Sequence, residues 1–184
     1  MTRYLRVAPL ATIAWVSLIL AGGCSSAPRP STPQAITLAS WQHHHATFYY
    51  YGLTSLYTCD GLQGKVKQIL LYLGARPDLK VETTACARLT APVHSAYVTA
   101  DFDTLTVVSS ATSPTVKGRW KPFIVAPHRP NFMGIGECEL IDQMKASIIA
   151  GFSLRDLHYD TRCFPRSVTI ADYSVDGQTL EAAG

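Results

Sequence analysis

Three consecutive histidines, His43-His44-His45, are the residues of this 184-residue chain whose type and spacing indicate chemistry most directly. In an extended segment successive side chains point to opposite faces, so His43 and His45 would share one face. Two imidazoles on one face could bind Zn²⁺ or Cu²⁺ together with a third ligand from elsewhere in the chain. The run therefore supports one hypothesis, a metal-binding or metal-dependent domain.

The alternative is a solvated histidine run without a ligand. The remaining histidines stand at no recognised ligand spacing: His94, His128 and His158. We therefore assign no metal ligand and expect no cofactor.

Carboxylates that could act in acid–base catalysis are Asp101 and Asp103, which lie two residues apart in a strand-like segment and so share a face. Such aspartates more often lie on the wet face of a sheet. No Gly-x-Ser-x-Gly elbow, phosphate loop or dinucleotide fingerprint is present. We assign no catalytic residue, and the sequence favours a protein that is not an enzyme without deciding the question.

Aromatic residues are dense around the histidine run, and they suit glycan or protein recognition when exposed and core packing when buried. The sequence alone does not distinguish these two roles. The residues are Trp41, Tyr49, Tyr50, Tyr51 and Tyr57.

The N-terminus has the anatomy of an export signal. Arg3 and Arg6 precede the apolar stretch 7–20, whose 14 residues are too few to cross a bilayer. The stretch ends in Leu20-Ala21-Gly22-Gly23-Cys24, which resembles the lipobox of bacterial lipoprotein precursors. This resemblance covers residues 1–24 only, and it implies a signal peptide at 1–23 and acylation of Cys24. Ordinary signal cleavage, giving a soluble periplasmic or secreted protein, is the alternative.

Residues 24–40 are expected to form a tether rich in proline and serine, which would hold a domain away from a membrane. In proteins with such a lipobox, a serine after the cysteine is compatible with the outer membrane. Ser25 therefore implies a lipid anchor in the outer membrane, with the domain facing the periplasm.

The composition excludes two broad classes. Hydrophobic residues make up 47% and charged residues 16%, so the chain can bury a core, and a wholly disordered protein is excluded. Of the 16 basic residues two belong to the signal, which leaves 14 against 13 acidic residues, a net charge of +1. This near-neutral balance does not indicate a nucleic-acid partner.

Four cysteines follow the signal, and an even number in an exported protein indicates disulfides. They are Cys59, Cys86, Cys138 and Cys163.

An internal repeat favours one of the possible disulfide pairings. An offset of 79 places Trp41 on Trp120, Cys59 on Cys138 and Arg76 on Arg155, and small drifts in the offset bring Cys86 onto Cys163 and Asp101 onto Asp172. If the halves are duplicates, the bridges are Cys59–Cys86 and Cys138–Cys163. Coincidence is the alternative to duplication.

Each half reads as strand, helix, strand, strand. Helical spacing begins after Cys59, with Asp60 as the expected N-cap and Gly74 as the expected end, and again from Cys138 to Phe152. Strands are expected at 47–53, 79–83 and 96–108 and at 123–126, 157–161 and 167–175, with a bulge near Asp103 and with 123–126 as an edge strand at best.

The expected fold class is α+β, with duplicated βαββ units in one sheet, two helices on one face and two intra-unit disulfides. The pseudo-repeats are 41–110 and 120–184, within a single domain at 41–184. Paired βαβββ modules of the vicinal-oxygen-chelate type and ferredoxin-like folds look similar in outline only. The expected function is binding of an envelope protein or a cell-wall glycan, without catalysis.

Overall fold

The computed structural model describes residues 35–85, 91–109, 114–163 and 172–183. The chain divides into two units, 1–32 and 33–184, and all the described residues belong to the second. The elements in chain order are β1 (Thr37–Tyr51), α1 (Cys59–Tyr72), β2 (Lys80–Thr84), β3 (Ser95–Val107), β4 (Val116–Val125), α2 (Cys138–Lys145), the short 3₁₀ helix η1 (Ile149–Gly151), β5 (Leu154–Thr161) and β6 (Tyr173–Ala182).

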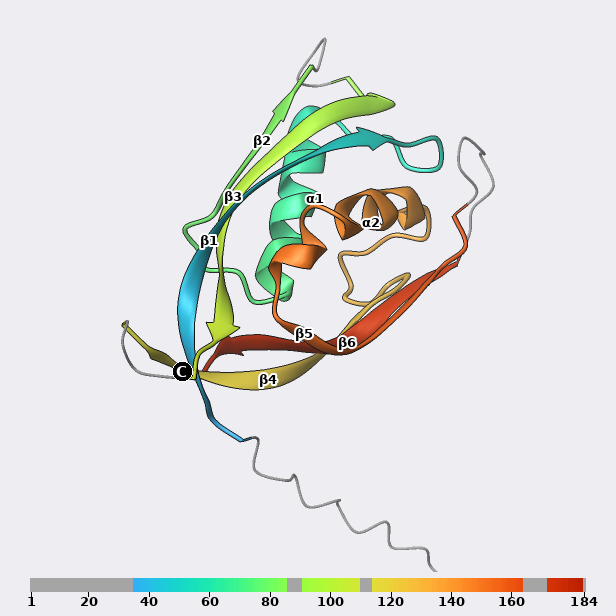
Figure 1. The fold of residues 1–184 in the computed structure, drawn as a ribbon. Helices are drawn as coiled ribbons and strands as arrows, with labels where there is room; N and C mark the ends of the chain where they lie inside the picture. Colours follow the sequence, from blue (N-terminus) through green and yellow to red (C-terminus); the bar gives the residue numbers. More distant parts are fainter. Residues whose placement is uncertain (1–34, 86–90, 110–113, 164–171, 184) are drawn as a thin grey trace, which may run out of the picture. The chain divides into compact units, whose positions relative to one another are not determined.

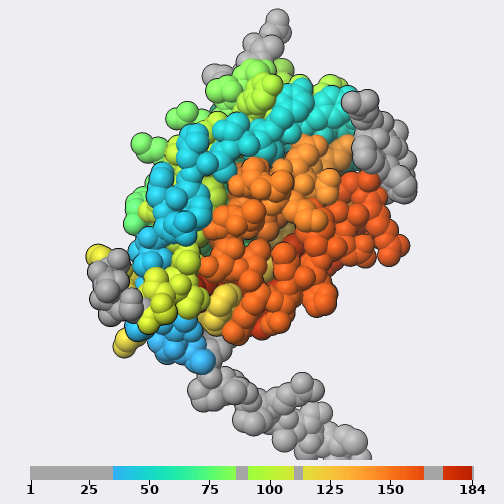
Figure 2. Space-filling model, in the orientation of Figure 1, coloured from blue at the N-terminus to red at the C-terminus, as the bar shows by residue number. Residues whose placement is uncertain are grey.

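The described strands form one antiparallel six-stranded sheet in the order β2-β3-β1-β4-β6-β5. The α+β class and the placement of both helices on one face are as predicted. Strands β1 and β4 pair only over Thr37–Ala39 and Val116–Gly118, so two half-sheets diverge from this junction around α1 and α2 (Figure 1). Residues of the α2 and η1 region, drawn in orange, lie between the half-sheets (Figure 2).

The main core lies between the helices and the inner face of the sheet. In β1 the even-numbered residues Ala46, Phe48 and Tyr50 face this core, where they meet the apolar stripe of α1. The alternate residues of β1 and β3 point to the outer face, which we define as the face opposite the helices. Local alternation alone thus decides which side chains the outer face presents.

Helix α1 begins and ends on residues suited to those positions. Its N-cap is Thr58, whose hydroxyl accepts from the Gly61 N–H at 3.0 Å, so the prediction of Asp60 as N-cap was wrong. Asp60 lies in the first turn, where its negative charge interacts favourably with the positive end of the helix dipole. The helix ends at Tyr72 with Leu73 as its C-cap, and Gly74 follows with a left-handed φ of 96°, so Gly74 stops the helix as predicted.

Helix α2 is shorter than predicted, since it ends at Lys145 and gives way to η1. The turn brings Gly151 against His44 and Phe102. A Cβ at Gly151 would lie 3.2 Å from the Phe102 ring, so a continuous helix with a larger residue would not fit here.

Several strand predictions need correction. Strand β4 begins at Val116, well before the expected 123–126, and β6 covers Tyr173–Ala182 where 167–175 was expected, of which 167–171 lie outside the described residues. The first strand begins at Thr37, so residues 37–40 of the expected tether belong to the sheet. Strand β3 pairs with β1 without a register shift, so there is no bulge near Asp103. The change of apolar phase arises because Leu105 belongs to a second small core on the outer face, with Ala39 and Leu180.

Strand β4 has neighbours on both sides only at its beginning. Beyond Gly118 it pairs with β6 alone, and its open side meets α1, where the Tyr72 hydroxyl bonds both backbone groups of Ile124. Pro122, which has no N–H, is tolerated because Ile124, two residues away, directs its N–H toward this same open side.

The disulfide Cys138–Cys163 joins the start of α2 to the end of β5, as predicted. Closing a loop of this length contributes about 3–4 kcal/mol in the chain-entropy model. Cys59 is also disulfide-bonded, and Cys86, its predicted partner, lies outside the described residues.

Candidate functional site

The histidine run lies in β1, where the alternation separates its members as predicted. His43 and His45 project from the outer face, whereas His44 points inward and stacks on Phe102 at a ring-centroid distance of 5.3 Å. The Thr104 hydroxyl donates to the Gly151 carbonyl, so it accepts a hydrogen bond from His44 Nε2 at 2.9 Å. Burial lowers the pKa of His44, and the neighbouring His43 lowers it further. His44 is therefore a neutral packing residue.

Each outward histidine faces an aspartate across the strand pair. His43 is opposite Asp103 and His45 is opposite Asp101 in the β1–β3 register. His43 Nδ1 donates to Asp103 at 2.9 Å, and His45 Nδ1 donates to Asp101 at 2.7 Å. We call these four residues the His–Asp row. Sequence reasoning placed each pair on one face but missed their meeting, because nothing local encodes which strands are neighbours.

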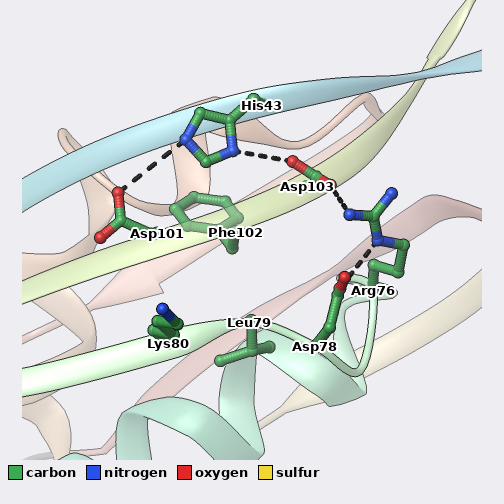
Figure 3. Close-up of a pocket in the computed structure, with 8 residues that line it drawn as sticks. All are labelled: His43, Arg76, Asp78, Leu79, Lys80, Asp101, Phe102 and Asp103. Atoms are coloured by element: carbon green, nitrogen blue, oxygen red, sulfur yellow. Dashed lines mark hydrogen bonds and ion pairs between the residues drawn. The ribbon is translucent and has the colours of Figure 1, made fainter.

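Charged residues from the loop between α1 and β2 extend this row. Arg76 Nη2 lies 2.5 Å from Asp103 Oδ2, and its Nε donates to Asp78 Oδ1 at 2.7 Å. With Lys80 and Leu79 these residues line an open pocket of about 330 Å³ beside the His–Asp row (Figure 3). The hydrogen bond to Arg76 lowers the pKa of Asp78, and the same bond raises the pKa of Arg76. The pocket thus mixes fixed carboxylate acceptors with cationic donors.

The arrangement offers hydrogen bonds to a polar ligand more readily than it offers a metal site. The described residues contain no group of three or more histidine, cysteine, aspartate or glutamate side chains that could hold a metal ion. Both Nδ1 atoms of the outward histidines are already bonded to carboxylates. Within that part of the chain, the metal hypothesis therefore lacks its third protein ligand.

The aromatic residues divide between core and surface. Tyr50 is fully buried and Tyr57 is partly buried against the main core, whereas Tyr49 and Tyr97 are 48% and 51% exposed on the outer face. These two rings face each other across β1 and β3 with centroids 5.0 Å apart. Tyr97 was not in the predicted patch, because its partner strand was unknown.

A buried polar network, which the sequence did not reveal, joins the two halves. Lys65 of α1 forms an ion pair of 2.7 Å with Glu137, which also accepts from the Tyr57 hydroxyl at 2.7 Å and the Gly134 N–H at 2.9 Å. Burial, followed by the charge of Glu137, raises the pKa of Tyr57 far above its ordinary value, so this hydroxyl remains a donor. These residues have a structural role, since every one of them is satisfied internally.

Glu139, two residues further on, extends this connection. Its carboxylate accepts from the backbone N–H groups of Leu53 and Thr54 at 2.8 and 3.1 Å and from the Thr54 hydroxyl at 2.9 Å. Gln143 bonds the N–H and carbonyl of Tyr51 in the same way. Helix α2 is thereby attached to the end of β1.

Removal of His45 should raise the pKa of Asp101. The hydrogen bond from His45 is the main reason that the pKa of Asp101 lies below its ordinary 3.8. His45→Gln is therefore expected to shift the Asp101 carboxyl titration upward in ¹³C NMR, and His94→Gln should leave it unchanged. A depressed carboxyl pKa stabilises the fold above the unfolded pKa, and the effect is lost as the pH falls through the folded one. An unmoved Asp101 titration in the His45 variant would contradict the pairing.

None of the helices in the described part of the chain is long and apolar enough to span a membrane. Comparison of the chain with protein-family models, with curated proteins and with solved structures gives no match.

Proposed function

We propose that this protein is an exported, lipid-anchored domain that binds cell-wall glycan through the outer face of β2, β3 and β1, without catalysis. One observation carries this proposal: the exposed Tyr49–Tyr97 pair and the His–Asp row lie on a single sheet face. Aromatic rings pack against the apolar faces of sugars, and they keep a polar edge for water or hydroxyls. Carboxylates and imidazoles next to them accept and donate hydrogen bonds to sugar hydroxyls.

The dimensions of this face suit a polymer. Trp41 and Tyr49 lie on the same side of β1, eight residues apart, which corresponds to roughly 26 Å along a strand. The polar His–Asp row lies between these aromatic ends. Several sugar units, or an extended segment of an envelope protein, would therefore contact the surface at the same time, and the mixture of hydroxyl-binding groups favours the glycan.

Tyr97→Ala is expected to weaken binding to insoluble cell-wall sacculi about tenfold, which corresponds to roughly 1.4 kcal/mol for the loss of an exposed aromatic contact. The measurement is cosedimentation of the exported protein with purified sacculi across a range of protein concentrations. Leu71→Ala, which removes an exposed apolar side chain from α1, is the matched control. Binding by the Tyr97 variant equal to that of the control would contradict the glycan assignment and favour an envelope protein.

The same proposal includes the covalent framework and the anchor. We propose acylation at Cys24, placement in the outer membrane facing the periplasm, a second bridge Cys59–Cys86, and an origin of the domain by duplication. The equal connectivity of β1-α1-β2-β3 and β4-α2-β5-β6 supports the duplication. Intact mass measurement on membrane-extracted protein tests the acyl group, and non-reducing peptide mapping tests the bridge. An unacylated Cys24 or a Cys24–Cys59 peptide would contradict these assignments.

A further inference from the structure

The two halves contain equivalent sets of three side chains on the outer face. Trp41 pairs with Leu105 across β1 and β3, and Trp120 pairs with Leu180 across β4 and β6. Both tryptophans pack against the same small outer core. An arginine lies over each indole: Arg76 at 5.7 Å from the ring centroid of Trp41, and Arg155 at 4.3 Å from that of Trp120.

A third residue completes each set at the same place in the register. Asp103 lies two residues before Leu105, and Gln178 lies two residues before Leu180. The Nη2 atom of the arginine contacts this third residue in both halves, at 2.5 Å for Asp103 and at 2.6 Å for Gln178 Oε1. By this register Asp176, and not Asp172 as the sequence repeat indicated, is the counterpart of Asp101.

The two sets differ in charge. Arg76 is paired with two carboxylates, those of Asp103 and Asp78. Arg155 is held only by the neutral amide of Gln178, through Nε at 3.1 Å and Nη2 at 2.6 Å, and no carboxylate among the described residues lies within 4.0 Å of its guanidinium nitrogens. Among the described residues, the second half therefore keeps this geometry with a neutral amide where the first half has a carboxylate.

The backbone next to Arg155 departs from regular strand geometry. Strand β5 shifts register between Arg155 and His158, and Asp156 adopts a left-handed φ of 52°. Gln178 donates from Nε2 to Asp156 Oδ2 at 3.1 Å, which orients its carbonyl toward the arginine.

We propose that Trp120, Arg155 and Gln178 form a recognition site for a carboxylate carried by the glycan, an inference that rests on the proposed function. A guanidinium has five N–H donors, of which Gln178 occupies the Nε–H and one on Nη2. The remaining N–H groups on Nη1 and Nη2 can bind a carboxylate in a two-pronged hydrogen bond. The indole supports the guanidinium from one face and reduces the freedom that binding would remove. Because both tryptophans contact the same outer core, this acid-binding site continues the glycan surface past the β1–β4 junction.

The test is an NMR titration of the exported mature chain, disulfides intact, with D-glucuronate and with D-glucose, which differ at the carboxylate. We expect glucuronate alone to shift the Trp120 indole N–H and the Arg155 Nε–H. Gln178→Glu places a carboxylate beside Arg155, as Asp103 does beside Arg76, and should weaken the response roughly tenfold or more, as should Arg155→Gln. Lys117→Gln, which removes an exposed cation from β4, is the matched control and should respond like the wild type.

The results of this titration distinguish the carboxylate site from the proposed wall-glycan ligand. If the Gln178 and Arg155 variants respond like the wild type, or if the Lys117 variant is weakened as much as they are, the carboxylate site is wrong. If glucose shifts the same resonances equally, the site does not distinguish a carboxylate from a neutral sugar, and the inference also fails. A specific response to glucuronate in a protein that does not cosediment with sacculi would retain the carboxylate site and refute only the proposed wall-glycan ligand.

Discussion

Replacement of Lys65 by Met is expected to lower the free energy of unfolding by about 3–5 kcal/mol, because it leaves a buried carboxylate without its cation. The Glu137 side chain is only 6% exposed, and the Lys65 ammonium 2.7 Å away is its charge partner. Methionine preserves the apolar stem of the lysine, so the decrease in the free energy of unfolding arises mainly from the loss of the ammonium charge. The measurement is urea unfolding at equilibrium, with the slope of the transition compared between variants.

Two further variants make this expectation specific. Lys67→Met removes an exposed lysine from the same helix and should change the free energy of unfolding by less than about 0.5 kcal/mol. The double variant Lys65→Met/Glu137→Gln removes both charges and should be more stable than Lys65→Met alone, since a neutral amide needs no cation, and its single oxygen can still accept from the Gly134 N–H while its NH2 group faces the Tyr57 hydroxyl. A Lys65 variant as mild as the Lys67 variant would show that the network does not hold the two halves together.

Phe102→Ala should lower the free energy of unfolding by a similar amount, about 3–5 kcal/mol, through the cavity that it creates. The ring is 2% exposed and stacks between His44 and Phe152, at centroid distances of 5.3 and 5.6 Å. Phe102 also lies between Asp101 and Asp103 in β3, so its packing sets the position of both aspartates on the other face. The same urea experiment measures the loss.

Conservative and opposite-face variants serve as controls for Phe102. Phe102→Leu keeps much of the volume and should cost about 1.5 kcal/mol or less. Tyr97→Ala removes an exposed ring from the same strand and should have little effect on stability while it weakens binding. Equal losses for the alanine and leucine variants of Phe102 would indicate that the ring is not packed as described.

The two half-sheets present different side chains at equivalent positions of the outer face. The first half presents tyrosines, imidazoles and carboxylates, and its Arg76 is paired with the carboxylates of Asp103 and Asp78. The second half has Pro122 where the first has His43, and Gln178 where the first has Asp103. In the function that we propose, a neutral stretch of a polymer would bind the first half, and an acidic group would bind at Arg155. Variants in the two halves should therefore respond to different parts of the ligand.

Several elements of the fold could be predicted from local sequence alone. The apolar spacing after Cys59 located α1, and the strand alternation correctly placed His43 with His45 and Asp101 with Asp103 on shared faces. These inferences succeeded because helix and strand periodicity depends on neighbouring residues only. The length of α2 was wrong for the opposite reason, since the contact of Gly151 with Phe102 is made across a long sequence separation.

What the sequence by itself determined about this protein is therefore the apolar spacing of its helices, the Cys138–Cys163 bridge, and the shared faces of His43 with His45 and of Asp101 with Asp103. Only the tertiary structure decided that His43 meets Asp103, that Arg76 and Arg155 lie over tryptophans, and that Lys65 and Glu137 are buried together. Strand order and register join residues that are distant in the chain, and the packing of the whole core selects them. The neutral partner of Arg155 is a property of that register, because Gln178 is the residue that lies opposite.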